Sequence, residues 1–126
     1  MDKKILIVDD EPHIRTLIEQ TLEELEDDGV SFLSADNGES ALEIIKAEVP
    51  QVVFLDVMMP RMNGMEVCRR VKKDLQLDNV FILLLTAKGQ ELDRQKGQEV
   101  GADVYMTKPF DPETLLLKAR EILMLD

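Results

Sequence analysis

The sequence predicts a single α/β domain in which helices cover both faces of a parallel sheet. Short apolar runs rich in β-branched residues alternate five times with amphipathic segments, as expected for successive βα units. The third and fourth runs are apolar at every position, which is typical of strands covered on both faces. The chain has 126 residues, 44% of them hydrophobic, and no repeat or low-complexity stretch. One core therefore accounts for residues 1–126 as a single domain.

The first half of the chain provides three expected strands and two expected helices. Pro12 suits the first turn of a helix, and Gly29 suits the position that ends it. Asp36, Asn37 and Gly38 form a turn before the second helix. The expected strands are residues 4–8, 32–35 and 52–55. The apolar positions at helical spacing, expected to face inward, are Ile14, Leu17, Ile18, Leu22 and Leu25 in the first helix and Ala41, Leu42, Ile45 and Val49 in the second.

The second half provides two further strands and three helices. Pro60, Asn63 and Gly64 break the chain after the third strand, and Asp111 and Pro112 suit the start of the last helix. The expected strands are residues 80–85 and 104–106. The expected helices are one that buries Val67, Cys68 and Val71, a more polar one over residues 90–100 that ends at Gly101, and a last one with an apolar stripe of Leu115, Leu116, Ala119, Ile122 and Leu123.

Five such units fit a flavodoxin-like, doubly wound (βα)5 sheet with the strand order 2-1-3-4-5 and helices on both faces. In these sheets the functional site lies beyond the carboxyl ends of the strands, at the switch point between strands 1 and 3. Polar residues stand at those ends: Asp9 and Asp10 after the first strand, Asp56 after the third, Thr86 after the fourth and Lys108 after the fifth. We therefore expect these five side chains to converge at one edge.

Three carboxylates at one edge repel one another, by roughly 1 to 4 kcal/mol for a pair about 4 Å apart. A raised pKa, the Lys108 ammonium or a bound cation must offset this repulsion. Because the expected ligands are all oxygen atoms, without histidine or cysteine, Mg²⁺ is the favoured cation. A carboxylate, a cation, a lysine and a hydroxyl suit phosphoryl transfer onto aspartate. Asp56 is the central candidate nucleophile, and the adjacent Asp9 and Asp10 suit a metal platform.

Composition excludes several other classes of protein. The net charge of −11 disfavours direct binding to nucleic acids and to anionic membrane surfaces. The apolar runs are too short to cross a bilayer, and the N-terminus lacks the pattern of a signal peptide. The single cysteine, Cys68, excludes an internal disulfide and a multi-cysteine metal site. We expect a cytoplasmic protein.

With these motifs in order, the sequence resembles the receiver domain of bacterial response regulators, the CheY-like superfamily of two-component signalling. The resemblance extends from Lys4 to about Leu125. The matching segments are Ile7-Val8-Asp9-Asp10-Glu11, Leu55-Asp56-Val57-Met58-Met59-Pro60 with Gly64 as a structural glycine, Leu85-Thr86-Ala87, Gly101-Ala102-Asp103 and Lys108-Pro109-Phe110.

The resemblance implies a role for each residue of the site. Asp56 would be the phosphoacceptor, and the donor would be a phosphohistidine on a histidine kinase or phosphotransfer protein. Asp10, Asp56 and the backbone carbonyl of Met58 would hold Mg²⁺, with Asp9 acting largely through water. Lys108 would pair with the phosphoryl oxygens.

It also implies a switch. Thr86 would bond the phosphoryl group, and Tyr105 would rotate inward as Thr86 moves, which changes the face formed by the fourth helix, fifth strand and fifth helix. The Lys108–Pro109 bond is expected to be cis. Because Met58 and Lys88 are long side chains at the positions that flank the attacking water in this family, we expect slow loss of the phosphoryl group.

The implied function is a phosphorylation-dependent signalling switch that catalyses only its own phosphorylation and dephosphorylation, and so is not otherwise an enzyme. A Mg²⁺-dependent aspartyl phosphatase of the haloacid dehalogenase type is a rival. That class needs a second aspartate two residues after the nucleophile, where this chain has Met58. Nucleotide binding is disfavoured because no glycine-rich phosphate motif follows the first strand.

Two readings of the whole protein are open: a stand-alone regulator of chemotaxis or phosphorelay type, or the N-terminal receiver of a DNA-binding transcriptional regulator. The chain ends at Asp126, just past the last expected helix, which favours the first reading. Transcriptional regulators of this family dimerise through charged pairs, for which this chain has Val104, Thr114 and Lys118 in place of an acid, a glutamate and an arginine. We expect a monomer in the unphosphorylated state, which acts on a downstream protein or an attached output domain.

Overall fold

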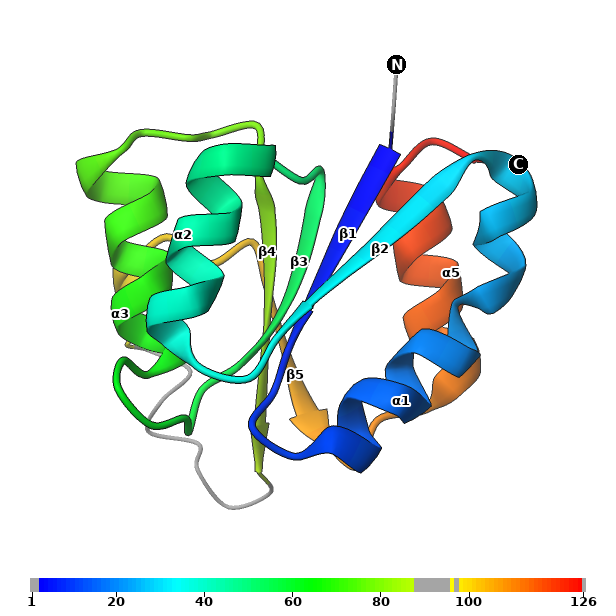
Figure 1. Cartoon of the computed structure of the whole chain (residues 1–126), viewed down its shortest axis with the longest axis horizontal. Coiled ribbons are helices and arrows are strands. Elements are labelled where there is room, and N and C mark those ends of the chain that lie inside the picture. The colour runs from blue at the N-terminus through cyan, green and yellow to red at the C-terminus, as the bar shows by residue number, and fades with distance from the viewer. Residues whose placement is uncertain (1–2, 88–95, 97, 126) are drawn as a thin grey trace.

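The sheet has five parallel strands in the order β2-β1-β3-β4-β5, as predicted (Figure 1). The structure is a computed structural model that describes residues 3–87, 96 and 98–125. The strands are β1 (Lys3–Val8), β2 (Val30–Ala35), β3 (Val52–Asp56), β4 (Phe81–Ala87) and β5 (Val104–Lys108). Because β1 pairs with both β2 and β3, the switch point lies between β1 and β3, near the middle of the sheet.

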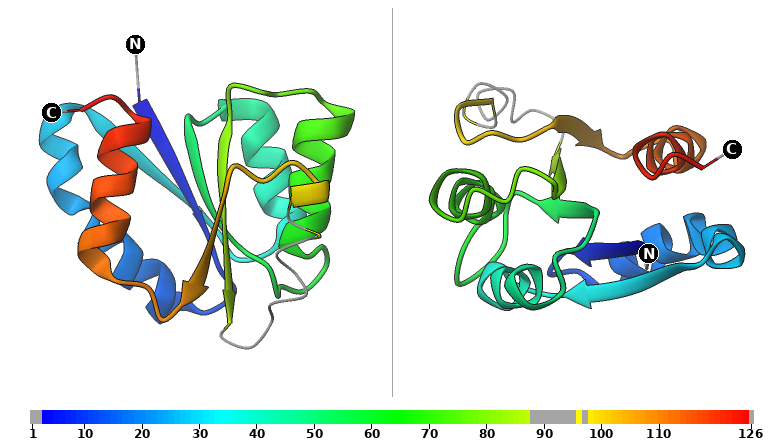
Figure 2. Two further views of the ribbon diagram at one scale, coloured as in Figure 1. Left: turned by 180° about the vertical axis from the view of Figure 1, so that it is seen from behind. Right: turned by 90° about the horizontal axis from the view of Figure 1, so that it is seen from above.

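Helices cover both faces of this sheet, with α1 and α5 on one side and α2 and α3 on the other (Figure 2). Their bounds are α1 (Pro12–Thr21), the 3₁₀ helix η1 (Glu23–Asp28), α2 (Gly38–Glu48), α3 (Gly64–Arg69), the π-helical turn η2 (Arg70–Asp74) and α5 (Pro112–Ile122). Most of the polar helix expected over residues 90–100 lies outside the described residues. Among the residues that the structure describes, no helix has the length and apolarity needed to span a membrane.

Two apolar clusters fill the space between the sheet and its two helical layers. Alternate residues of β1 enter them, with Ile5 and Ile7 on the α1–α5 side and Leu6 and Val8 on the α2–α3 side. Every residue of β3 is buried, as the uninterrupted apolar pattern predicts for a strand covered on both faces. The apolar interior thereby confines the polar side chains to the strand ends.

The first helix differs from its prediction, because the structure divides it into α1 and η1. The N–H of Leu25 donates to the carbonyl of Leu22 at 2.9 Å, so the hydrogen bonds shift to three-residue spacing, and both leucines are fully buried. Continuing the α-helix would also place the acids of 23–28 at the negative end of its dipole. Gly29 ends η1 at φ 85°, as predicted for a glycine after a helix.

Two residues predicted to face inward do not. Val49 is 36% exposed and caps the end of α2 with a φ of 43°, because α2 stops at Glu48. Leu17 is 44% exposed, since the buried stripe of α1 passes through its neighbour Ile18. The acidic residues of η1 are exposed, and Arg120 of α5 pairs with two of them, Glu24 and Asp28. A side chain from the other end of the chain thus joins η1 to α5.

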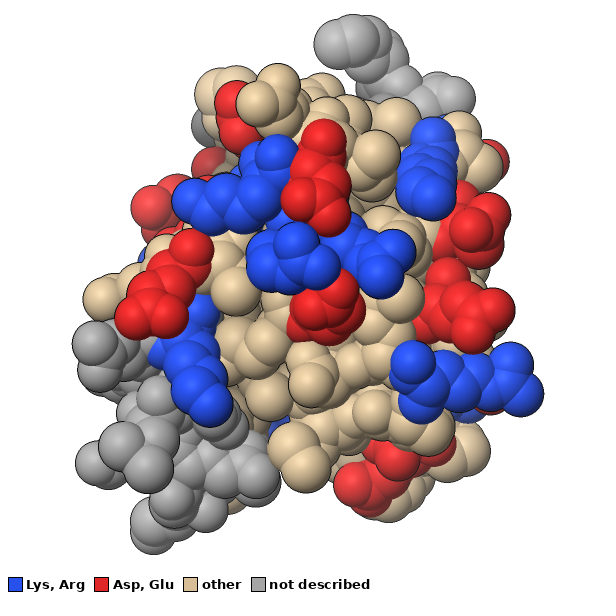
Figure 3. Space-filling view, turned by 90° about the vertical axis from the view of Figure 1, so that its left-hand side faces the viewer, with Lys and Arg blue, Asp and Glu red and all other residues tan. Residues whose placement is uncertain are grey.

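On the opposite side of the molecule, the end of α3 continues into η2 and carries several basic residues. Lysine and arginine side chains gather there between acidic ones (Figure 3). Arg69 and Arg70 both pair with Glu66 on the exposed surface. Lys72 is different, because its side chain is only 8% exposed and its Nζ lies 2.8 Å from Oδ2 of Asp103.

Asp103 joins three segments just before β5. The same Oδ2 accepts the N–H of Ile82 in β4 at 2.8 Å, and the N–H of Asp103 donates to the carbonyl of Ile82 at 3.0 Å. Nearby, Gly101 has a φ of 93°, and a β-carbon there would lie 3.1 Å from Cβ of Lys72. The ion pair between the buried side chain of Lys72 and the partly exposed Asp103 therefore fixes η2 against the starts of β4 and β5.

We expect this pair to contribute more to stability than exposed pairs do. Asp103→Ala leaves a mostly buried ammonium and the N–H of Ile82 unpaired, and should cost roughly 2–3 kcal/mol, below the value for a fully buried pair because Asp103 is partly exposed. A double-mutant cycle with Lys72→Met, followed by urea unfolding, should give a coupling of about 1 kcal/mol or more. The exposed pair of Glu43 and Lys46, 4.0 Å apart, is the control and should give under about 0.5 kcal/mol. Equal coupling in the two pairs would contradict this account.

Candidate functional site

The carboxyl ends of four strands bring the predicted site residues to one edge of the sheet. Asp9 follows β1, Asp56 ends β3, Thr86 lies near the end of β4, and Lys108 ends β5. Asp9 is fully buried, and Asp56 and Thr86 are 5% and 2% exposed. Polar side chains with so little solvent contact need partners within the protein.

Lys108 provides that partner for two carboxylates. Its Nζ donates to Oδ2 of Asp9 at 2.7 Å and to Oδ1 of Asp56 at 3.2 Å. The Lys108 side chain is 18% exposed, so the interaction is poorly screened by water. One ammonium on the edge strand thereby partly neutralises two carboxylates at the switch point.

The charges at this edge are not balanced. Burial raises the pKa of Asp56 from its ordinary 3.8 to about 6, and the carboxylate of Asp9 adds to the increase. The charge and hydrogen bond of Lys108 lower this pKa, and the charge of Asp10 raises it further. Burial by itself would lower the pKa of Lys108, but its hydrogen bond to Asp9 and the charge of Asp56 outweigh burial and raise it. The site thus favours a further cation near Asp56.

Backbone and side-chain hydrogen bonds hold Asp9 in place. Its Oδ1 accepts the N–H of Glu11 at 2.9 Å, and its own N–H donates to the carbonyl of Ala35 at 3.2 Å. Nη1 of Arg15 donates to the Asp9 carbonyl at 2.6 Å. Arg15 was not among the predicted site residues, although its place one turn into the helix that follows Asp9, Asp10 and Glu11 is a usable signal.

Asp9, Asp10 and Glu11 form a group that could hold a metal ion. One oxygen from each residue lies within 4.8 Å of the others, with Asp9 buried and the other two exposed. Glu11 was not among the predicted ligands, and its Oε2 also lies 3.2 Å from Nε2 of His13. An oxygen-only set that is open to solvent on one side fits Mg²⁺, which keeps several waters. Asp10 also influences Asp56 through its charge, so the group adjoins the predicted phosphoacceptor.

The loop between β3 and α3 begins at the site and is held by close backbone packing. Gly64 donates its N–H to the carbonyl of Val57 at 2.8 Å. A β-carbon at Gly64 would overlap the carbonyl oxygen of Asp56 and lie 3.0 Å from its carbonyl carbon. Gly64 is therefore a structural glycine, as predicted, because only a residue without a side chain fits beneath Asp56. Met58, next to this packing, is 60% exposed.

The predicted switch residues lie on the two neighbouring strands β4 and β5. Tyr105 is paired in register with Leu84, and its ring is partly buried against the α2–α3 side of the core. Thr86 is paired with Thr107 in the same ladder. The Lys108–Pro109 peptide bond is cis, which confirms that prediction. Lys88, expected to flank the path of water, lies outside the described residues.

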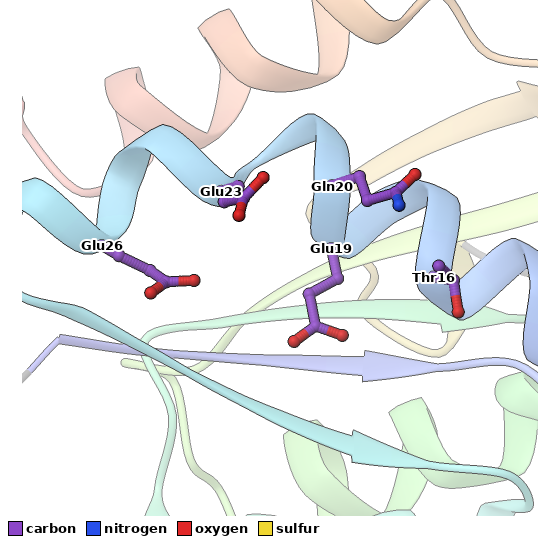
Figure 4. Close-up of a pocket in the computed structure, with 5 residues that line it drawn as sticks. All are labelled: Thr16, Glu19, Gln20, Glu23 and Glu26. Carbon is purple, nitrogen blue, oxygen red and sulfur yellow. The ribbon is translucent and has the colours of Figure 1, made fainter.

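A groove of about 140 Å³ lies away from this edge, along α1 and η1. Figure 4 shows its lining, in which three glutamates and two uncharged polar residues surround the groove. These residues are Thr16, Glu19, Gln20, Glu23 and Glu26. The groove shares no residue with the acidic group of Asp9, Asp10 and Glu11 or with Asp56.

Comparison with known proteins gives a consistent result. The response regulator receiver domain family matches residues 5–120. The alkaline phosphatase synthesis transcriptional regulatory protein PhoP of Bacillus subtilis (strain 168) is 43% identical over 98% of this chain and 49% of its own length. The probable transcriptional regulator ycf27 of Porphyra purpurea is 44% identical over 96% of this chain and 47% of its own.

Solved structures agree with the sequence relatives. The chemotaxis response regulator CheY4 of Vibrio cholerae is similar with a TM-score of 0.82 and 34% identity, covering 97% of this chain and 99% of that chain. This chain spans about half the length of the curated relatives PhoP and ycf27. Its strand order, its site residues and these matches show that the chain belongs to the response regulator receiver domain family, whose members are the signalling switches of two-component systems.

Proposed function

We propose that Asp56 is the phosphoacceptor of this receiver domain. The observation that carries the proposal is the position of Lys108 Nζ, 2.7 Å from Asp9 and 3.2 Å from Asp56, at the edge of the sheet that also holds the acidic group. A carboxylate oxygen of Asp56 would form a bond to phosphorus while the bond between phosphorus and the imidazole nitrogen of a phosphohistidine breaks. The imidazole leaves and takes up a proton from solvent.

Mg²⁺ fits the acidic group, and members of this family typically use it. Asp10, Asp56 and the Met58 carbonyl would hold the ion, with Asp9 acting through water and Glu11 as a further oxygen donor from the same loop. When bound, Mg²⁺ would neutralise the negative charge of the phosphoryl oxygens. Burial raises the pKa of Asp56 to about 6 while Lys108 opposes the increase, so Asp56 is still largely ionised at neutral pH.

The switch would follow from the charge added to Asp56. A phosphoryl group there prefers the state in which Lys108 and the hydroxyl of Thr86 close on it, and this differential affinity shifts an existing equilibrium. Movement of Thr86 would leave space for the partly buried ring of Tyr105. The surface around β5 and α5 would then report the change to an output partner.

The relatives favour one of the two readings of the whole protein. Because the chain spans about half of PhoP and ycf27, both named as transcriptional regulators, we propose that it acts as the receiver part of a transcriptional regulator. A histidine kinase or phosphotransfer protein would be its donor. The charged dimer contact of those regulators would need a glutamate where this chain has Thr114. The hydroxyl of Thr114 instead donates to Oδ2 of Asp111 at 2.7 Å, in the cap of α5. The unphosphorylated domain would be a monomer.

Phosphorylation of Asp56 can be tested by intact mass. Incubation with acetyl phosphate and Mg²⁺ should add one phosphoryl group to the wild-type chain and none when EDTA removes the metal. Asp56→Asn should remain unmodified because it lacks the nucleophile. The matched control is Asp27→Asn in the exposed end of η1, which should be modified like wild type. A phosphoryl group on the Asp56 variant would overturn the assignment.

The role of Thr86 can be separated from phosphorylation. Thr86→Val keeps the volume but removes the hydroxyl, and a hydrogen bond to a charged group contributes roughly 1.5–3 kcal/mol. The variant should still accept a phosphoryl group, but its switched population should fall about 10- to 100-fold. The measurement is the NMR shift of the Tyr105 ring on phosphorylation. Thr107→Val, the exposed register partner on β5, is the control and should switch normally.

The raised pKa of Asp56 predicts a pH-dependent stability gain for Asp56→Asn in EDTA. The folded pKa of about 6 lies above the ordinary 3.8, so ionisation of Asp56 destabilises the folded wild type as pH rises between these values. The variant should therefore equal wild type near pH 4 and exceed it at pH 7, by up to roughly 3 kcal/mol. Urea unfolding measures this difference.

Saturating Mg²⁺ should reduce that difference, because it binds the folded wild type and offsets the charge. A difference that is independent of both pH and Mg²⁺ would contradict this electrostatic explanation.

A further inference from the structure

We propose that Gly38, at the start of α2, is a positioning residue for the metal site. It acts through the loop between β3 and α3, by holding Met62 and so the carbonyl of Met58. The inference rests on the proposed function, because the loop matters chemically only if Mg²⁺ binds at the aspartates. Gly38 lies far from them in sequence and belongs to none of the groups described above as ligands, acids or switch residues.

The first observation is a backbone contact without space for a side chain. A β-carbon at Gly38 would overlap the carbonyl oxygen of Met62 and lie 2.7 Å from its carbonyl carbon and 2.8 Å from its Cβ. Gly38 does not lie in the left-handed region, so conformational freedom is not what requires glycine here. The requirement is space alone, and the obstacle is backbone that cannot rotate away.

The second observation is strain in the loop that Gly38 contacts. Arg61 has a φ of 69°, and the N–H of Met62 donates across it to the carbonyl of Pro60 at 2.8 Å. Three-residue turns with a positive φ at the centre are rare and strained. Such a conformation persists only when its surroundings hold it, and the start of α2 is the neighbour that touches its last residue.

The third observation is that α2 is fixed at the point of contact. Asn37, 9% exposed, caps the helix with Oδ1, which accepts the N–H of Ser40 at 2.8 Å. Its Nδ2 donates to Oδ1 of Asp36 at 2.8 Å and to Oγ of Ser40 at 3.1 Å. Ala41 in the first turn is fully buried. The start of α2 therefore cannot retreat to accommodate a larger residue, and the loop must move.

The loop is pinned at its other end as well. Asn63 caps α3 by accepting the N–H of Glu66 at 2.9 Å, and Gly64 is bonded to Val57 and packed beneath Asp56. Met58 lies between these fixed points, only four residues before Met62. Displacement of Met62 must consequently be absorbed within the segment that carries the Met58 carbonyl.

The test compares Gly38→Ala with Gly29→Ala in the whole 126-residue chain. A β-carbon at Gly29 would meet nothing within 4 Å, although its φ of 85° imposes a general cost in stability. Removal of a residue that orients a ligand typically weakens metal binding about 10- to 100-fold. Isothermal titration with MgCl₂ should therefore show a Kd raised about tenfold or more for Gly38→Ala, and changed less than about twofold for Gly29→Ala.

Two further measurements follow the loop and its use of Mg²⁺. In the metal-free protein, the amide NMR shifts of Met58, Met59, Arg61 and Met62 should change in Gly38→Ala and not in Gly29→Ala. With acetyl phosphate as donor, the Mg²⁺ concentration that gives half the maximal phosphorylation rate should rise in Gly38→Ala, while the rate at saturating Mg²⁺ should be largely retained.

If Gly38→Ala does not fold, the variant Arg61→Gly provides the test. It relieves the strain while the contact remains, so its Mg²⁺ affinity should stay within about twofold of wild type, and a tenfold loss would overturn the proposal.

The outcomes separate two kinds of failure. If wild type binds Mg²⁺ and Gly38→Ala binds it equally well, Gly38 is only a packing residue and this inference is wrong. If wild type itself binds no Mg²⁺, the proposed function fails, and the metal-free NMR shifts alone decide whether Gly38 sets the shape of the loop.

Discussion

The structure depends on one electrostatic constraint, which is that two buried carboxylates share a single ammonium. Asp9 follows β1 and Asp56 ends the adjacent strand β3, whereas Lys108 comes from the edge strand β5. The lysine must cross the ends of β4 and β3 to reach Asp9, which requires a long, flexible side chain. Because the pair of carboxylates is more negative than one ammonium can balance, the edge keeps an affinity for further positive charge.

The sequence predicts the sheet, its order and the residues at its carboxyl edge, because each of these follows from local pattern and from general rules of parallel sheets. The uninterrupted apolar run of β3 and the caps at Asn37 and Asp111 are signals of that kind. It does not predict the break between α1 and η1, where the burial of both Leu22 and Leu25 and the remote Arg120 decide the geometry. Tertiary contacts overrule helical periodicity at that point.

The candidate site divides in the same way. Asp9, Asp56, Thr86 and Lys108 are predictable because a strand end is visible in the sequence, whereas the Arg15 bond to the Asp9 carbonyl depends on how α1 leaves the loop. The contact of Gly38 with Met62 joins residues from two different βα units. The sequence does not predict this contact, because at this position it shows only a glycine after an asparagine. The candidate site residues follow recognisable sequence patterns at strand ends, whereas the residues that position them are identified only by tertiary contacts.

This division has a physical reason that concerns rigidity. An ammonium can follow a displaced carboxylate through its rotatable bonds, but a backbone carbonyl moves only with its loop. Lys108 therefore needs no precise support, whereas the β3–α3 loop needs one, and two glycines provide it from opposite ends. Gly64 lets the loop pack beneath Asp56, and Gly38 lets α2 pack against Met62. The precision of the proposed metal site, which would use the main-chain carbonyl of Met58, would thus depend on where the surrounding elements have no side chain at all.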